Sequence, residues 1–294
     1  MAAGSFGMGR PLLATLGDGR TITGLEVGDP GGLPLLYFHG TPGSAVEVEH
    51  LAAHAHACGV RLIGLNRPGI GGGTFARRRS VGDWTADAAA AARVLGLDRP
   101  AVLGYSGGGP YALACALDPE SFGPIAVVAG ASPVLTRQDV LAMDPTDRSL
   151  TFLGRRAPRI GAFLVAVSGH WVRRFPRSAL RMWMMGLPDA DRSVLRANGG
   201  PGRATMTHLG TVLAASGRGV VEDERALADS WGFEPADVTA PVRWWHGDDD
   251  RIVPLRLARP FIESLPNVDL TIVPGAGHLV LDRVAPLVFS FVKD

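Results

Sequence analysis

Strand-like and helix-like segments alternate along this chain of 294 residues, except in one long stretch where no convincing strand occurs. That stretch runs from about Pro133 to about Val238 and holds only amphipathic and Arg-rich segments. Alternation of strands and helices is typical of a largely parallel sheet that is covered by helices on both faces. We therefore predict an α/β core formed by residues 1–132 and 239–294, with an inserted helical cap at 133–238.

The individual elements follow from apolar runs and turn residues. Leu12–Leu16 and Thr21–Val27 flank a Gly-Asp-Gly turn, so an antiparallel pair is expected. Leu33–Phe38 is a continuous apolar run, as expected for a strand that is buried on both faces. The other expected strands are Val60–Leu65, Ala101–Tyr105, Ile125–Ala129, Val242–His246 and Leu270–Val273. The expected helices are Val46–Cys58, Asp83–Leu95, Gly107–Leu117, Leu255–Leu265 and Leu279–Val292.

Composition and charge exclude several classes of protein. Apolar residues make up 46% and charged residues 19%, which is too apolar for a disordered chain. The net charge of +1 gives no overall field that would attract nucleic acid, so we expect a small-molecule substrate and no nucleic-acid partner. Cys58 and Cys115 match neither a disulfide framework nor a metal-site spacing. Met1–Leu16 lacks the pattern of a signal peptide and no run of about 18 apolar residues occurs, so we expect a cytoplasmic protein without a transmembrane segment.

A G-x-S-x-G sequence, Gly104-Tyr105-Ser106-Gly107-Gly108, follows an expected strand and precedes an expected helix. In this context the motif presents a serine nucleophile on a sharp turn, and its glycines let neighbouring backbone approach closely. The amide of Gly107, at the start of the helix, can donate to an oxyanion. A dinucleotide-binding loop is excluded, because Ser106 stands where that motif needs its second glycine.

A serine nucleophile needs a base that is itself held by a third group. His278 ends a Gly-rich loop between the last expected strand and the last expected helix, which is a suitable place for the base. His39 and His246 also lie at strand ends, but each precedes a glycine in a tight turn, and a structural part is the simpler interpretation.

Three adjacent carboxylates, Asp248, Asp249 and Asp250, follow the strand that ends at His246. Each of them could simply form the turn. Pro254 marks the start of the next helix and so places Asp250 in the loop between strand and helix. The chain order Ser106, Asp250, His278 is the order of one class of hydrolases.

Together these motifs resemble the α/β-hydrolase superfamily, in particular its capped, esterase-like and lipase-like serine hydrolases. The resemblance covers residues 39–291 except the cap. Residues 39–43, HGTPG, are similar to the family's H-G-x-P oxyanion loop, and residues 67–71, RPGIG, to its D-R-P-G-x-G loop. The chain departs from the second motif with Asn66 where Asp is usual and Gly73 where Ser is usual. Both positions shape the loop and lie outside the expected chemistry.

The resemblance implies a catalytic triad of Ser106 as nucleophile, His278 as base and Asp250 as the orienting acid, because the family's G-x-x-D-x-x-V-P motif carries its acid at the fourth position. It also implies an oxyanion hole made by the amides of Thr41 and Gly107. The expected enzyme is a serine hydrolase that cleaves small, moderately hydrophobic esters through an acyl-enzyme and needs no cofactor or metal.

Other functions stay open under the same resemblance. Cofactor-free lyases use these three residues to move protons, and receptor-like relatives bind a ligand in the same pocket. Proline iminopeptidases have a similar oxyanion loop, but their usual Gly-Gly-Ser-Trp-Gly sequence differs from that around Ser106, and the middle of the insertion has few acids to hold a substrate ammonium. Serine at this position argues against haloalkane dehalogenases and epoxide hydrolases, which use a carboxylate nucleophile.

The insertion is rich in arginine and in large apolar residues. Residues 148–203 hold eleven arginines and only two acids. Five apolar residues recur there at helical spacing: Ile160, Phe163, Leu164, Val167 and Trp171. The simpler interpretation is a stripe that packs on the core, and the alternative is a surface that attracts anionic or lipid-like substrates. The candidate substrate-binding residues, chosen as adaptable apolar walls, are Tyr105, Trp171, Trp183 and Met184.

Overall fold

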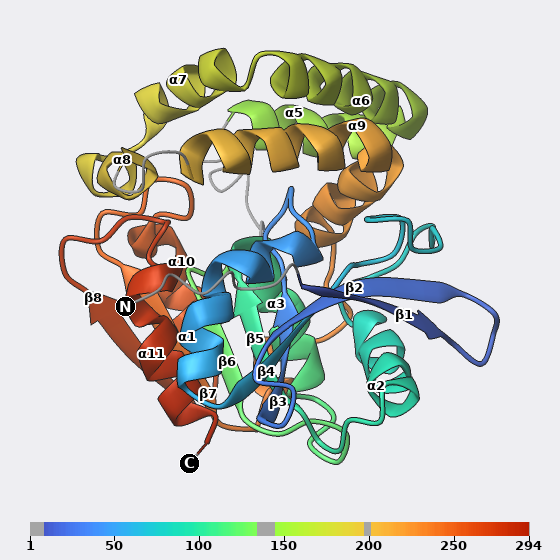
Figure 1. The fold of residues 1–294 in the computed structure, drawn as a ribbon, viewed down its shortest axis with the longest axis vertical. Helices are drawn as coiled ribbons and strands as arrows, with labels where there is room; N and C mark the ends of the chain where they lie inside the picture. The colour runs from blue at the N-terminus through green and yellow to red at the C-terminus, as the bar shows by residue number, and fades with distance from the viewer. Residues whose placement is uncertain (1–8, 134–144, 197–200, 294) are drawn as a thin grey trace, which may run out of the picture.

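The computed structural model describes residues 9–133, 145–196 and 201–293, which are drawn in colour in Figure 1. These residues form one sheet of eight strands in the order β1-β2-β4-β3-β5-β6-β7-β8. The pairs β1–β2 and β2–β4 are antiparallel, and all other neighbours are parallel. The strands are β1 (Arg10–Thr15), β2 (Thr21–Gly28), β3 (Leu33–Phe38), β4 (Val60–Leu65), β5 (Ala101–Tyr105), β6 (Ile125–Val128), β7 (Val242–Gly247) and β8 (Val268–Val273).

Helices cover both faces of the sheet, which confirms the predicted α/β architecture. The central strand β3 is buried on both sides: Leu36 and Phe38 pack in one apolar cluster, and Leu35 and Tyr37 pack in the other. The first cluster includes α2 (Trp84–Val94), α3 (Gly109–Cys115) and α10 (Leu255–Glu263). The second includes the 3₁₀ helix η1 (Ala45–Leu51), α1 (Ala52–Ala57) and α11 (Leu281–Phe291). The helix predicted over Val46–Cys58 is therefore two consecutive segments, η1 and α1.

Five helices of the described chain lie between β6 and β7 and form a layer at one end of the sheet (Figure 1). Within this helical insertion, α6 and α7 lie furthest from the strands. The helix α9 is broken at Ser216, where the backbone is non-helical, and the 3₁₀ helix η3 (Pro235–Asp237) then leads toward β7. The helices are α5 (Pro145–Arg156), α6 (Pro158–Arg174), α7 (Pro176–Gly186), α8 (Asp189–Arg196) and α9 (Pro201–Ala228). No helix in the described ranges is both long enough and apolar enough to cross a bilayer.

The helices α6 and α9 pack through small residues, not through the apolar stripe that the sequence singled out. The buried face of α6 consists of Gly161, Ala162, Val165 and Gly169. A Cβ added at Gly169 would overlap the backbone of α9, so the two helices approach closely. The stripe Ile160–Trp171 lies on the other side of α6 and is exposed, so the simpler interpretation of the stripe as a core-packing face is wrong. Close backbone contact through small residues turned the larger side chains outward.

The tight α6–α9 contact makes a prediction about stability. Replacing Gly169 by Ala places a methyl group against the backbone of Leu213 and Ala214. We expect the Gly169→Ala substitution to lower the free energy of unfolding by about 1–3 kcal/mol relative to the parent, which is the usual cost of overpacking a core. Helix propensity alone would change stability in the opposite direction, because Ala is the better helix former.

The matched control is Gly186→Ala, at the end of α7, where an added Cβ meets nothing within 4 Å. Urea unfolding should show this variant unchanged or slightly more stable than the parent. A Gly169→Ala variant as stable as the control would contradict the close packing.

Candidate active site

Ser106 lies on a strained turn between β5 and α3. Its φ is +52°, a left-handed value that residues with a side chain rarely adopt. The turn is held by close backbone contacts: a Cβ at Gly104 would lie 2.5 Å from the carbonyl oxygen of Gly108, and a Cβ at Gly108 would overlap the carbonyl of Phe38. These contacts explain why the G-x-S-x-G motif needs its two flanking glycines.

His278 joins Ser106 to Asp250. Its Nε2 lies 2.9 Å from Ser106 Oγ, and its Nδ1 lies 2.8 Å from Asp250 Oδ2. All three residues are buried. Since an ionised carboxylate can only accept, Nδ1 carries a proton toward Asp250, and in the neutral form of this tautomer Nε2 can accept from the Ser106 hydroxyl. The structure thus brings together the three residues that the sequence named, from the ends of β5, β7 and β8.

Asp250 accepts three hydrogen bonds and has a second histidine beside it. Its Oδ1 accepts from the amides of Ile252 and Val253 at 2.9 and 2.8 Å. Its Oδ2 contacts His278 and also His246 Nε2, at 3.3 Å. Burial raises the pKa of Asp250, but the charge interaction with His278 and the contacts with both histidines outweigh burial and hold this pKa well below its usual range. His246, interpreted from sequence as structural, donates from Nε2 to the Val253 carbonyl at 2.8 Å and lies beside the acid.

Thr41 and Gly107 lie side by side next to Ser106. A Cβ added at Gly107 would lie 2.6 Å from Thr41 Oγ1 and 3.0 Å from the Thr41 amide nitrogen. A Cβ at Gly40 would lie 3.9 Å from Ser106 Oγ. Glu47 fixes the start of this loop, because its Oε2 accepts from the Gly40 amide at 3.1 Å and from the Tyr37 hydroxyl at 2.8 Å. The backbone of residues 39–43, predicted from sequence to form an oxyanion loop, therefore lies next to Ser106.

The loop that carries His278 is held from two sides. The Tyr105 hydroxyl donates to the His278 carbonyl at 3.2 Å, and the two rings lie 5.5 Å apart. From the helical insertion, Asp191 on α8 accepts from the amides of His278 and Leu279 at 3.0 and 2.8 Å. Burial raises the pKa of Asp191, although these two amides oppose the rise. Tyr105 thus supports His278, and its assignment to a substrate pocket stays a prediction.

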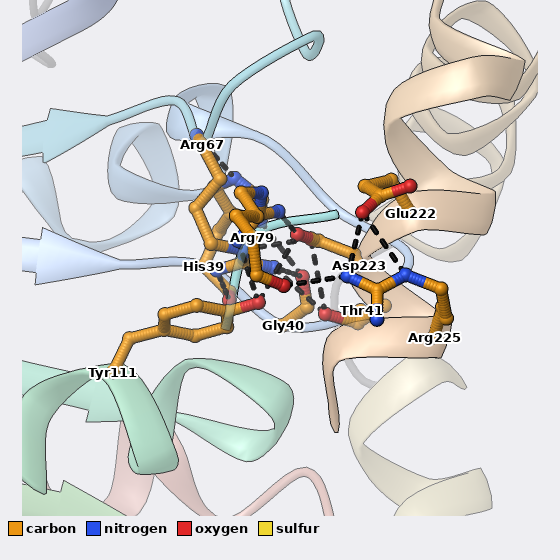
Figure 2. Close-up of polar contacts among 9 residues, drawn as sticks. All are labelled: His39, Gly40, Thr41, Arg67, Arg79, Tyr111, Glu222, Asp223 and Arg225. Atoms are coloured by element: carbon orange, nitrogen blue, oxygen red, sulfur yellow. Dashed lines mark hydrogen bonds and ion pairs between the residues drawn. The ribbon is translucent and has the colours of Figure 1, made fainter. Parts of the chain in front are cut away.

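A buried ion-pair network links α9 to the oxyanion loop (Figure 2). Arg67 Nε donates to Asp223 Oδ2 at 2.7 Å, and both side chains are fully buried. The same guanidinium donates to the carbonyls of His39 and Gly40 at 2.6 and 3.0 Å, and to Thr41 Oγ1 at 2.7 Å. One arginine of the core therefore holds the loop after β3 in place and is itself neutralised by an acid of the insertion.

A second arginine extends this network to the helix behind Ser106. Arg79 forms an ion pair with Asp223 Oδ1 and donates to the Tyr111 hydroxyl on α3 at 2.9 Å. The Arg67 guanidinium lies 4.7 Å from the centre of the Tyr111 ring, a cation–π distance. Arg225, which pairs with Glu222, also donates to the Arg79 carbonyl at 2.6 Å. Figure 2 shows these side chains converging from α3, α9 and the loops after β3 and β4.

Asn66, which departs from the family motif, fits its place in the loop. Its Oδ1 accepts from the Ala45 amide at 2.7 Å, and its Nδ2 donates to Thr23 Oγ1 at 3.0 Å. An amide can accept and donate at once, whereas a carboxylate only accepts. This loop-shaping part agrees with the sequence interpretation.

Three residues predicted to bind substrate lie on the outer helices. Trp171 is exposed, and its ring packs 6.2 Å from that of Phe175. Trp183 and Met184 are half-buried on α7. Their part in a substrate pocket stays a prediction.

Sequence reasoning did not place Asp223, Asp191 or Arg67 in the site, although Arg67 begins the RPGIG motif. One signal was available: Asp191 is one of two acids in an Arg-rich stretch, and Asp223 lies in an acidic triplet on an otherwise mixed helix. Such acids stand out in the sequence, but their partners do not: Asp223 pairs with Arg67 and Arg79 only because of where α9 lies against the core, and Asp191 accepts from backbone amides. In the described parts of the chain, no cluster of three or more His, Cys, Asp or Glu residues could hold a metal ion.

The chain belongs to the α/β-hydrolase fold family, whose model, described as "alpha/beta hydrolase fold", matches residues 34–283. Solved structures similar to it include an esterase from Exiguobacterium antarcticum, with 20% identity, a TM-score of 0.69 and coverage of 96% of this chain and 99% of that one. A bromoperoxidase from Bacillus anthracis is 17% identical, with a TM-score of 0.70 over 97% and 100% of the two chains. An enol-lactonase from Burkholderia xenovorans is 14% identical, with a TM-score of 0.67 over 96% and 98%. At these identities the likeness is one of fold.

The Arg67–Asp223 pair makes a second prediction about stability. Replacing Asp223 by Asn keeps the shape but leaves two buried guanidinium groups without their counter-charge. We expect the free energy of unfolding to fall by about 3–5 kcal/mol, the usual cost of removing one partner of a buried ion pair. The exposed pair Arg243–Asp269 provides the control, because Asp269→Asn should cost about 1 kcal/mol or less. Equal urea midpoints for the two variants would show that the buried pair adds nothing to stability.

Proposed function

We propose that this protein is a serine hydrolase that cleaves small, moderately hydrophobic esters through an acyl-enzyme. One observation carries the proposal: Ser106, His278 and Asp250 form a continuous chain of short contacts, 2.9 and 2.8 Å long, at a strained turn in a hydrolase-family fold. Esterases among the similar structures support the choice of an ester bond.

In the proposed first step, Ser106 Oγ attacks the ester carbonyl while His278 Nε2 takes its proton. Asp250 holds the ring so that Nδ1 keeps its proton, and it stabilises the imidazolium that forms. The low pKa of Asp250 keeps the carboxylate ionised throughout. The imidazolium then gives its proton to the leaving alcohol, and the acyl group stays on Ser106.

The developing oxyanion is assigned to the amides of Thr41 and Gly107. Two donors fixed before the reaction stabilise the tetrahedral intermediate without reorganisation. The clamp of Arg67 on the carbonyls of the same loop supports this part, because it fixes the orientation of the peptide units around Thr41. In the second step, water gives a proton to His278 and attacks the acyl carbonyl, and Ser106 leaves with the proton from the imidazolium.

We assign the choice of substrate to the helical insertion, the predicted cap at 133–238. An aminopeptidase needs a carboxylate to hold the substrate ammonium. The two acids that the insertion brings against the site loops are engaged elsewhere, Asp223 by Arg67 and Arg79, and Asp191 by two backbone amides. Without a carboxylate for the ammonium group, an uncharged ester is favoured over an amino-acid amide. Burial of the acyl chain adds about 0.8 kcal/mol of binding free energy for each CH₂.

The nucleophile is tested by Ser106→Ala. We expect the variant to lose turnover of a short-chain p-nitrophenyl ester and to lose labelling by a fluorophosphonate, while its circular dichroism spectrum matches the parent. Turnover that survives the substitution would exclude Ser106 as nucleophile. Release of an acid and an alcohol in equal amounts by the parent distinguishes a hydrolase from a lyase that uses the same three residues.

The acid is tested by two neighbouring substitutions. Asp250→Asn should lower kcat by about 10⁴-fold, because the amide favours the wrong imidazole tautomer. Asp249→Asn is the matched control: this side chain is exposed, pairs only loosely with Arg251 at 3.4 Å, and should leave kcat nearly unchanged. The reverse result, with Asp249 essential and Asp250 dispensable, would contradict the assignment.

A further inference from the structure

Large apolar side chains are exposed together on the outer helices α6 and α7. Of the sixteen such side chains in the described residues, eight lie between Ile160 and Met185. We call these eight the apolar face: Ile160, Phe163, Leu164, Val167, Trp171, Phe175, Met182 and Met185. Phe163 is 66% and Met185 76% exposed, values that are unusual for such residues when they occur as a group.

The part of the apolar face on α6 is a true helical stripe. Positions 160, 163, 164, 167 and 171 follow the spacing that aligns side chains on one side of a helix. The opposite side of α6 is buried through Gly161, Ala162, Val165 and Gly169, and Gly169 packs closely against the backbone of α9. In Figure 1, α6 and α7 form the end of the molecule that is furthest from the sheet. The apolar face is therefore presented outward by a helix that is fixed from behind.

Positive charge surrounds the apolar face. Residues 148–188 contain eight arginines and no aspartate or glutamate. Five of these arginines lie on or between α6 and α7, are exposed, and form no ion pair within the described ranges: Arg159, Arg173, Arg174, Arg177 and Arg181. Arg174 lies 5.2 Å from the centre of the Phe175 ring, so charge and aromatic surface are in direct contact.

We propose that the apolar face and its five arginines dock on an anionic lipid surface. Amphipathic helices that lie in a membrane interface combine Trp, Phe and Leu on one side with arginines that reach the headgroups. Here Phe163 and Trp171 would enter the region between headgroups and acyl chains, while the arginines would meet lipid phosphates. The long arginine side chains can keep their charge at the headgroup level while their stems cover apolar surface. The close α6–α9 contact lets this happen without rearrangement of the fold.

The charge pattern selects lipid over a second copy of the chain. A two-fold dimer through this face would place the same patch on both subunits. Each subunit would then bring arginines against arginines, with no acid on the segment to pair with them. Nucleic acid would satisfy the arginines but would leave the aliphatic side chains Ile160, Leu164 and Val167 without an apolar partner. An anionic bilayer offers phosphates to the arginines and an apolar interior to the aliphatic side chains.

The test is flotation of the full chain with liposomes of ether-linked phospholipids, which contain no ester for the proposed hydrolase to cleave. We expect binding to liposomes that contain phosphatidylglycerol, little binding to pure phosphatidylcholine, and weaker binding at high salt. The double variant Phe163→Ser, Trp171→Ser should lower the affinity about tenfold for each side chain removed. The triple variant Arg173→Gln, Arg174→Gln, Arg177→Gln should lower it about fivefold for each arginine.

The controls use equally exposed residues elsewhere on the molecule. Leu287→Ser on α11 should bind like the parent, and so should a triple variant of Arg77, Arg93 and Arg256 to Gln. Three outcomes would overturn the proposal: no flotation of the parent, equal losses in the control variants, or a stable dimer in solution that the Phe163 and Trp171 substitutions dissociate. Binding to duplex DNA in place of liposomes would overturn it as well. Esterase activity is not used as a readout, so a failure here leaves the proposed function untouched, and the reverse also holds.

Discussion

The buried contact between Arg67 and Asp223 is the interaction on which the arrangement of the molecule depends. Two fully buried charges are tolerated only when each is neutralised and its remaining hydrogen-bonding groups are satisfied. Arg67 meets this requirement with one carboxylate, two carbonyls and one hydroxyl, and these partners belong to α9 and to the loop after β3. The helical insertion and the core are thus joined at the same point that fixes the backbone beside Ser106.

Close backbone contact through glycines also shapes the molecule, both at the turn around Ser106 and between the helices α6 and α9. At the turn around Ser106, Gly104 and Gly108 let β5, α3 and the end of β3 come together without side chains between them. In the insertion, Gly169, Gly210 and Gly217 do the same for α6 and α9. Both contacts decide how particular side chains are presented. The first holds the Ser106 hydroxyl on a strained turn, and the second turns the large side chains of α6 toward the outside.

These contacts connect the outer surface with the candidate active site. The helix α9 packs against α6 on one side, and on the other its Asp223 pairs with Arg67, which holds the loop after β3. His208 on the same helix lies 2.9 Å from Ser44, just after that loop. On α8, Asp191 holds the backbone of the loop that carries His278. The insertion therefore contacts both the loop that carries His278 and the loop after β3, through acids other than Asp250.

The strands and the central residues of the candidate site could be predicted from local sequence patterns. Apolar runs and turn residues predict the eight strands, and the motifs around Ser106, Asp250 and His278 predict three residues that the structure brings within hydrogen-bonding distance, because short motifs fix local backbone and side-chain chemistry. The environment of the site depended on contacts between residues far apart in the chain. No local pattern pairs Arg67 with Asp223 across 156 positions, or chooses which side of α6 is buried. Hydrophobic periodicity shows that a helix has an apolar face. Only tertiary packing decides whether that face, or a face of small residues as on α6, is turned toward the rest of the protein.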